Sequence, residues 1–291
     1  MADQRMRTLQ KIGFNEEPFS RSADPRFFWK SELLADSQMH LRQMISQRRA
    51  LGIVEANYGM GKSALARMLH SAYLADPNNY VTLYTHSTVY SSLFSVLKDV
   101  GRRLGVRQGS FGSTTTALRE IEKVLIRHYQ DGKNVVLFFD DAQGIKPEGL
   151  HAFRIFYNFD VTEKLVQCLL FTQPEIRKNL DKVPEVVSRI DTWLQLSPLS
   201  VSETSQMVNH RTTLAGRDAP LFTKYAFELL WEKSFGVPRE IMSVCNTALN
   251  ILIEQDDKTI IDEAMFEKAC GFLDKNRSGV NCQQQDNASG N

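Results

Sequence analysis

Residues 51–63 read Leu-Gly-Ile-Val-Glu-Ala-Asn-Tyr-Gly-Met-Gly-Lys-Ser. A short apolar run leads into a glycine-rich turn, and a helical pattern continues from Ala64 to Leu74. Gly59 and Gly61 permit a tight turn whose N–H groups point inward, and the positive end of the next helix faces the same space. This layout is typical of a phosphate-binding loop. The alternative is a glycine-rich strand-to-helix turn that binds no ligand.

The individual positions of this loop predict how a nucleotide binds. Lys62 is expected on the β- and γ-phosphates, and the Ser63 hydroxyl on Mg²⁺. The residues expected around the nucleotide are Asn57, Tyr58, Gly59, Met60, Gly61, Lys62, Ser63 and Ala64. Ala56 stands where the strict pattern begins with glycine, and alanine is tolerated there if its φ angle is negative.

A second stretch, residues 134–143, reads Asn-Val-Val-Leu-Phe-Phe-Asp-Asp-Ala-Gln. Its five consecutive apolar residues are typical of a strand that is buried on both faces of a parallel sheet. Asp140 is expected to hold Mg²⁺ opposite Ser63, and Asp141 to orient the attacking water. An acidic turn after a strand is the alternative. Both stretches together, in this order, favour a single nucleotide site.

The composition indicates a globular protein, since 42% of the 291 residues are hydrophobic and 24% are charged. No apolar run reaches the roughly 20 residues that cross a bilayer, and the N-terminus lacks the apolar segment of a secretion signal. The four cysteines form no Cys-x-x-Cys pair, so a zinc site is not expected. These features predict a cytoplasmic protein without a membrane partner. Because the net charge is +1, any nucleic-acid contact must come from a local patch.

Strand patterns alternate with helical patterns up to Pro198, and only helical patterns follow. The strands are expected at 52–56, 80–84, 134–140, 166–171 and 192–196. This order predicts an α/β fold with a parallel five-stranded sheet, followed by a small all-helical lid. We expect an N-terminal lead on the adenine side at 1–35, a nucleotide-binding domain at 36–200, the lid at 201–275 and a disordered tail at 276–291. Asp36 is expected to cap the first helix.

The order of these features resembles the AAA+ ATPases, and in particular their ExeA-type branch, which includes the TnsC- and TniB-like regulators of DNA transposition. The resemblance extends over roughly residues 11–255. The motifs that carry it are Ile12-Gly13-Phe14, Pro18-Phe19-Ser20, Asp24-Pro25-Arg26-Phe27, Asp140-Asp141-Ala142-Gln143, Thr172-Gln173-Pro174-Glu175, Ser188-Arg189-Ile190, His210-Arg211 and Gly236-Val237-Pro238-Arg239-Glu240-Ile241. Each motif is weak alone, but the ordered series is specific. The resemblance implies ATP and Mg²⁺ as cofactors, and assembly with copies of itself into a ring or helical filament.

The resemblance also implies roles for residues outside the loop. Gln173 corresponds to a sensor of the γ-phosphate, although a polar turn at the end of a strand has the same appearance. Arg239 corresponds to a second sensor at the start of a lid helix, with a solvated arginine as the alternative. Phe14 and Phe19 are implied to line the adenine pocket, whereas core packing explains them equally well.

Two features bear on the rate of hydrolysis. Arg189 corresponds to an arginine finger that acts on the nucleotide of the next subunit, and Arg177 is its rival. Asp141 stands where the family has glutamate, so its shorter carboxylate is expected to hold the attacking water about 1 Å from the best position. A displacement of that size costs around 10²-fold in rate. The sequence therefore predicts tight ATP binding and slow hydrolysis.

A local basic patch indicates a DNA contact. Lys98, Arg102 and Arg103 lie close together on one helical pattern, and a small polar segment that includes Thr114 follows. Such residues contact phosphates without reading bases. TnsC-like proteins place their DNA-facing residues in roughly this region, which favours duplex DNA as a partner. A solvated basic helix face is the alternative.

Two functions compete for the same fold. The first is a regulator that oligomerises on duplex DNA with ATP and recruits a transposase, together with a target-selection protein. The second is an ATPase of a secretion or envelope assembly, as in ExeA-type proteins. Those proteins usually continue into a membrane span and a wall-binding domain, which this sequence does not show after the lid, and this favours the first function. The sequence does not support a third function, that of a metabolic enzyme, because no cluster of His, Cys or Ser indicates a substrate site.

Overall fold

The computed structural model describes residues 2–20, 25–86, 88–255 and 258–273. The predicted tail at 276–291 lies outside the described residues. The chain divides into two compact units: Glu32–Ser197, called here the core unit, and Met1–Ser31 with Pro198–Asn291, called here the helical unit.

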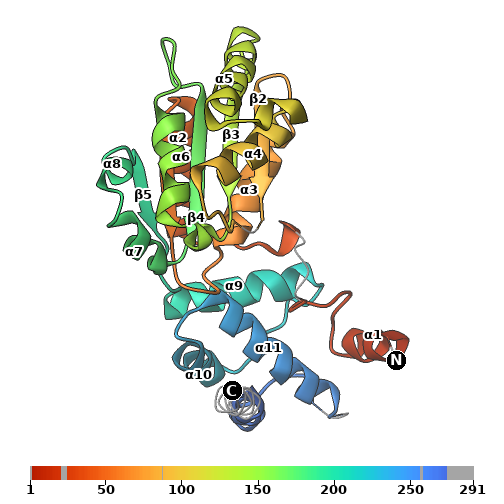
Figure 1. Ribbon diagram of the computed structural model, residues 1–291. Coiled ribbons are helices and arrows are strands. Elements are labelled where there is room, and N and C mark those ends of the chain that lie inside the picture. The colour runs from red at the N-terminus through yellow and green to blue at the C-terminus, as the bar shows by residue number, and fades with distance from the viewer. Residues whose placement is uncertain (1, 21–24, 87, 256–257, 274–291) are drawn as a thin grey trace, which may run out of the picture. The chain divides into compact units, whose positions relative to one another are not determined.

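Within the described residues, the core unit is built on a single five-stranded sheet with the order β2-β3-β4-β1-β5 (Figure 1). All neighbouring strands pair in parallel. The strands are β1 Leu51–Glu55, β2 Tyr80–Thr85, β3 Asn134–Phe139, β4 Val166–Thr172 and β5 Thr192–Gln195. The predicted α/β fold with a parallel five-stranded sheet is thereby confirmed.

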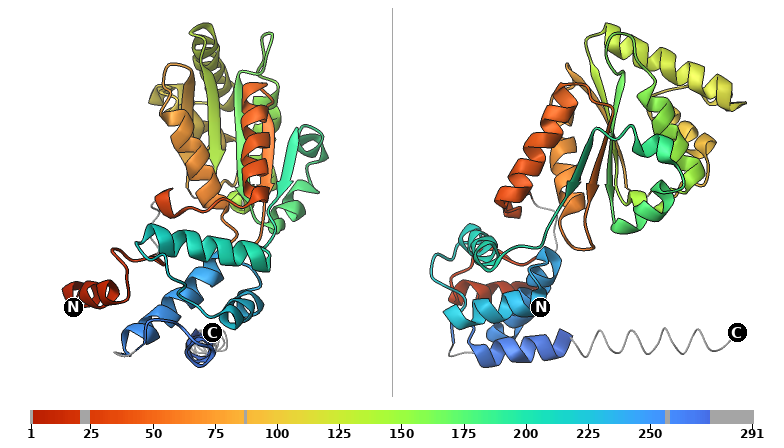
Figure 2. Two further views of the ribbon diagram at one scale, coloured as in Figure 1. Left: turned by 180° about the vertical axis from the view of Figure 1, so that it is seen from behind. Right: turned by 90° about the vertical axis from the view of Figure 1, so that its left-hand side faces the viewer.

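Helices cover both faces of this sheet (Figure 2). One face carries α2 Glu32–Ser46 and α3 Lys62–Leu74, and the other carries α4 Leu93–Arg103, α5 Thr114–Gln130 and α6 Pro147–Tyr157. Every residue of β1, β3 and β4 is buried, which explains why these strands are mostly apolar on both faces instead of alternating. The core unit also contains the 3₁₀ helices η2 Gln108–Phe111, η3 Ala142–Gly144 and η4 Pro174–Ile176, and the short helices α7 Arg177–Leu180 and α8 Pro184–Val187.

One helix start differs from the prediction. Helix α2 begins at Glu32, so Asp36 lies inside the helix and does not cap it. Asp36 is exposed, whereas Leu41, Met44 and Ile45 are buried on the side that packs in the protein. The buried residues of α2 all follow Asp36, so burial does not account for the additional first turn from Glu32 to Ala35.

The helical unit combines the N-terminal segment with the helices that follow the sheet. Its elements are α1 Ala2–Lys11, η1 Pro25–Phe27, α9 Val201–Leu214, α10 Lys224–Ser234, α11 Pro238–Ile253 and a further helical segment at 263–273. Phe14 and Phe19 are buried in its core together with residues of α9, α10 and α11, such as Val208, Leu230 and Ile241.

Two arginines join the N-terminal segment to the rest of the helical unit. Arg217 is buried and donates hydrogen bonds to the carbonyl oxygens of Ile12, Pro220 and Thr259. Arg211 donates to the carbonyl oxygens of Pro18 and Phe27, both at 2.8 Å. Because each guanidinium satisfies several backbone oxygens at once, the chain at Ile12, Pro18 and Phe27 is held by directional bonds as well as by apolar packing.

The turn before α11 shows why the motif at residues 236–241 begins with a glycine. Phe235 and Gly236 both have positive φ angles, 51° and 67°. A Cβ atom at Gly236 would lie 2.1 Å from the carbonyl oxygen of Leu199, which is backbone and has little freedom to move. Glycine is therefore required here both by conformation and by space.

Gly236→Ala is expected to destabilise the helical unit by about 1–3 kcal/mol, because alanine adds backbone strain and a clash. Gly271→Ala is the matched control, since a Cβ there meets no atom within 4 Å. Thermal or urea unfolding of both variants measures the difference. Equal stability of the two variants would contradict this account of the turn.

Candidate functional site

The phosphate-binding loop predicted from the sequence connects β1 to α3. Gly59 and Gly61 have φ angles of 82° and 91°, and Gly61 is the residue that precedes the helix. Ala56 is not among the described residues with positive φ, so the alanine in place of the first glycine is compatible with the turn. Of the other predicted contacts, Asn57 and Tyr58 are exposed, Met60 is buried, and Ser63 and Ala64 are half-buried at the start of α3.

Lys62 lies at the centre of the loop. Its side chain is buried, and its ammonium donates hydrogen bonds to the carbonyl oxygens of Ala56 at 2.7 Å and Asn57 at 2.9 Å. Burial lowers the pKa of Lys62 below its ordinary value, and the negative charges of Asp141 and Asp140 oppose that shift. β1 and β3 both pair in parallel with β4, so the loop that follows β1 and the aspartate turn that follows β3 lie at the same edge of the sheet.

Asp140 follows β3 and is 3% exposed. Its Oδ1 accepts from the Asp141 backbone N–H at 3.1 Å, and its Oδ2 accepts from the Tyr84 hydroxyl at 2.7 Å. A carboxylate oxygen has two lone pairs, so each oxygen retains capacity for a further partner. Tyr84 has no signature in the sequence, because a tyrosine near the end of a strand belongs to no motif of its own.

Asp141 is exposed and has a left-handed backbone, with φ 53° and ψ 41°. Aspartate tolerates this region better than most residues. The buried Thr88 hydroxyl lies 3.1 Å from the Asp140 carbonyl oxygen and 2.9 Å from that of Asp141, and it donates to this pair. The turn therefore directs the second carboxylate outward while the first stays buried.

Gln143 connects the aspartate turn to the predicted sensor. Its Nε2 donates to Asp141 Oδ1 at 3.3 Å, and its Oε1 accepts from the Gln173 backbone N–H at 3.3 Å. Gln173 is half-buried just after β4. Since β3 and β4 are adjacent and parallel, their ends meet at one edge of the sheet, where ligands bind in open α/β folds. The predicted role of Gln173 as a sensor stays a prediction.

The two candidate arginine fingers differ in what they contact. Arg177 forms a two-pronged ion pair with the buried Glu55, at 2.8 and 3.0 Å, and its guanidinium lies over the Trp193 ring. Arg189 donates to the carbonyl oxygen of Glu185 and lies near the Tyr157 ring. Arg177 is thus engaged with a carboxylate of its own subunit, which favours Arg189 for a role in trans; that role stays a prediction.

Three other predicted site residues belong to the helical unit. Phe14 and Phe19 are fully buried in its core, and Arg239 is exposed at the second residue of α11. Core packing accounts for both phenylalanines within this unit. Their predicted place beside adenine, and that of Arg239 beside the γ-phosphate, stay predictions.

The predicted DNA-contacting residues lie on α4 and at the start of α5. Arg102 is exposed, and Lys98 is half-buried. Arg103 forms an ion pair with Asp99 at 3.0 Å and donates to the Tyr84 carbonyl oxygen at 3.0 Å. Thr114 is the first residue of α5, which begins after the capping residue Ser113. Lys98 and Arg102 are therefore better placed than Arg103 to meet phosphates.

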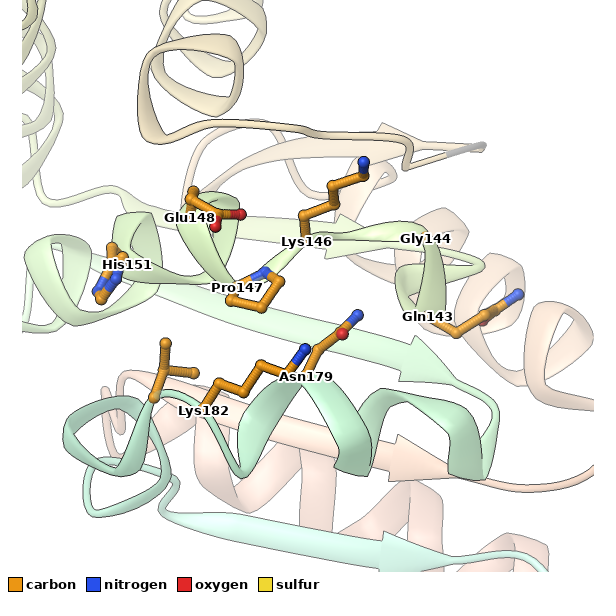
Figure 3. A pocket seen from close by; sticks show the side chains of 9 residues that line it. Gln143, Gly144, Lys146, Pro147, Glu148, His151, Asn179 and Lys182 are labelled. Carbon is orange, nitrogen blue, oxygen red and sulfur yellow. The ribbon is translucent and has the colours of Figure 1, made fainter.

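A separate open cavity of about 660 Å³ lies beside the aspartate turn (Figure 3). It is formed where α6 begins and α7 ends, and its lining residues are Gln143, Gly144, Lys146, Pro147, Glu148, His151, Asn179, Lys182 and Val183. Figure 3 shows Lys146 and Gln143 directed away from Pro147, while Lys182 is directed toward Asn179. The phosphate-loop residues do not line it.

The donor set of the loop and the aspartate turn fits Mg²⁺. Among the described residues, no three His, Cys, Asp or Glu side chains gather into a metal cluster. A hydroxyl oxygen from Ser63 and a carboxylate oxygen from Asp140 are the hard ligands that Mg²⁺ takes alongside phosphates and water. In the part of the chain that the structure describes, no helix combines the length and the apolar character that a membrane span requires.

Comparisons with known proteins agree with this geometry. Residues 44–180 match the family model of the AAA domain. The chain is 27% identical over 256 residues to general secretion pathway protein A of Aeromonas hydrophila, a match that covers 82% of this chain and 44% of that protein. The chain thus spans less than half of that relative's length.

Solved structures share the fold across most of the chain. The Aeropyrum pernix ORC2 protein, in its ADPNP-ADP complexes, has a TM-score of 0.64 at 17% identity and covers 89% of this chain and 72% of its own. The Aeropyrum pernix ORC1 protein, in complex with DNA, has a TM-score of 0.63 at 14% identity and covers 88% of this chain and 70% of its own. At these identities the likeness establishes the fold alone.

Asp141→Glu is expected to speed ATP hydrolysis by up to about 10²-fold, because the longer carboxylate reaches the attacking water. Asp141→Asn is the matched variant, since asparagine tolerates the left-handed backbone but cannot accept the proton. It is expected to bind ATP and to hydrolyse it more slowly than the unchanged chain. Phosphate-release assays measure both rates. No acceleration in Asp141→Glu, with its fold intact, would contradict the predicted displacement.

Proposed function

We propose that this protein is an ATPase that oligomerises on duplex DNA in its ATP-bound form and regulates DNA transposition. The observation that carries the nucleotide part is the buried Lys62 ammonium beside the carboxylates of Asp140 and Asp141, at the carboxyl edge of a parallel sheet. The match to the AAA domain and the likeness to a fold described with ADPNP and ADP support it.

Each element of the site contributes one part of the proposed reaction. The loop's N–H groups and Lys62 bind the β- and γ-phosphates, which carry most of the negative charge. Bound Mg²⁺, held through Ser63 and Asp140, would neutralise charge on the transferred phosphoryl group. Asp141 orients the attacking water. Because Lys62 bonds to the Ala56 and Asn57 carbonyl oxygens, its ammonium exchanges those partners for phosphate oxygens when ATP binds.

The oligomer follows from the proposed role of Arg189. A residue that completes a neighbour's site makes assembly depend on the nucleotide, and head-to-tail contacts of this kind generate rings or helical filaments. Arg177 is held by Glu55 of its own subunit, which leaves Arg189 as the better finger. The proposed assembly is cytoplasmic.

The DNA part rests on α4. Lys98 and Arg102 would contact phosphates of either strand without reading bases, so binding would be independent of sequence and weakened by salt. The fold is shared with a protein whose structure is described in complex with DNA. Recruitment of a transposase and a target-selection protein rests on the ordered motif resemblance.

A second function has an observation of its own. The match to general secretion pathway protein A extends over 82% of this chain and favours an ATPase that serves a secretion or envelope assembly. The two functions share the nucleotide site and differ in the partner. DNA binding in the presence of an ATP analogue separates them.

Lys62→Ala is expected to weaken the affinity for Mg²⁺-ATP by at least about tenfold, because it removes a charged hydrogen-bond donor from the phosphates. Lys123→Ala is the control, since that lysine pairs with Glu120 on the exposed side of α5. Isothermal calorimetry measures both affinities. Unchanged binding by Lys62→Ala would exclude this loop as the nucleotide site.

The double variant Lys98→Gln with Arg102→Gln is expected to weaken DNA binding for all sequences and to reduce the salt-dependence slope by about 2. The control is the double variant Lys233→Gln with Lys268→Gln, which removes two positive charges from exposed positions of the helical unit. Gel shift and negative-stain microscopy are done with ATP analogue, with ADP and without nucleotide. Nucleotide-dependent filaments on DNA support the proposal. Affinity for membrane or cell-wall fractions, without affinity for DNA, supports the secretion function instead.

A further inference from the structure

The carboxylate of Asp140 is held from a strand that the phosphate-loop and aspartate motifs do not include. Tyr84 lies on β2, where its backbone is paired with Phe138 of β3. Its hydroxyl donates to Asp140 Oδ2 at 2.7 Å. Because Asp140 is 3% exposed, water has little access to replace this donor. The hydrogen bond therefore sets which way the carboxylate faces.

The tyrosine ring has little freedom to leave this position. It packs edge-on against His70, with ring centroids 5.3 Å apart, and stacks on Phe138 at 6.5 Å. A tyrosine hydroxyl ordinarily loses its proton only at a pH of about 10, so at neutral pH the Tyr84 hydroxyl remains a donor to Asp140.

We propose that Tyr84 is the positioning residue of the metal site, because its hydroxyl fixes the orientation of the Asp140 carboxylate. This inference rests on the proposed nucleotide function. Without the hydroxyl, Asp140 Oδ2 loses its donor and the carboxylate is free to rotate. The rotation makes the carboxylate a less ordered ligand for Mg²⁺, whereas the phosphate loop is unaffected.

The experiment compares nucleotide affinity with and without the metal. The Kd for a non-hydrolysable ATP analogue is measured by calorimetry in Mg²⁺ and in EDTA, and the ratio of the two values reports how much the metal contributes. Tyr84→Phe keeps the ring and removes the hydroxyl. It is expected to reduce this ratio by about tenfold, as is usual when a partner of a metal ligand is lost, with the Kd in EDTA unchanged.

Tyr90→Phe is the matched control. The Tyr90 hydroxyl also donates to an aspartate of the core unit, Asp99 at 2.5 Å, but Asp99 lies on α4 and takes no part in the proposed metal site. Tyr90→Phe is expected to leave the Mg²⁺-to-EDTA ratio unchanged. Thermal unfolding of both variants confirms that they are folded.

The outcomes separate the inference from the function on which it rests. A ratio in folded Tyr84→Phe equal to that of the unchanged chain overturns the positioning role while the nucleotide site stands. An equal reduction in Tyr84→Phe and Tyr90→Phe also overturns it, because the effect would then be general. Absence of nucleotide binding in the unchanged chain overturns the proposed function itself.

Discussion

The parallel pairing of β1 with β4, and of β4 with β3, is the constraint on which the site depends. The registers place Glu55 opposite Thr172 and Phe139 opposite Leu170, so the three strands end close together. The phosphate loop, the aspartate turn and the Gln173 turn each begin where one of these strands ends. A slip of one residue in either pairing would turn buried side chains to the opposite face and separate these turns.

Hydrogen bonds and an ion pair hold most of the polar groups around the site in fixed orientations. Thr88 holds the carbonyl oxygens of the aspartate turn, and Gln143 bridges that turn to the end of β4. Glu55, at the end of β1, is paired with Arg177. Lys62 is the exception, because its ammonium bonds only to carbonyl oxygens of its own loop, in the residues that the structure describes. The geometry thus pre-organises the carboxylates and leaves the cation able to change partners.

The sequence was sufficient to predict the sheet and the loop. Runs of apolar residues predicted the buried parallel strands, and the glycines of the phosphate loop predicted the positions where φ is positive. Tyr84 and Thr88 were not predictable, because their roles arise from strand pairing across the sheet instead of from local spacing. The start of α2 at Glu32 was missed because the side chain of Asp36 suggested a cap, although aspartate also occurs inside helices. The sequence of the N-terminal segment indicates a polar lead, but Arg211 and Arg217, which lie far away in sequence, bind its carbonyl oxygens.

The central claim is that a triphosphate and its metal bind between the loop and the first aspartate. The most direct test is an experimental structure of the protein with Mg²⁺ and a non-hydrolysable ATP analogue. The account predicts phosphates within hydrogen-bond distance of the Gly59–Ser63 backbone and Lys62, with Mg²⁺ coordinated by Ser63 and reached by Asp140 directly or through water. Nucleotide bound elsewhere, or a metal that lies away from both residues, would contradict it.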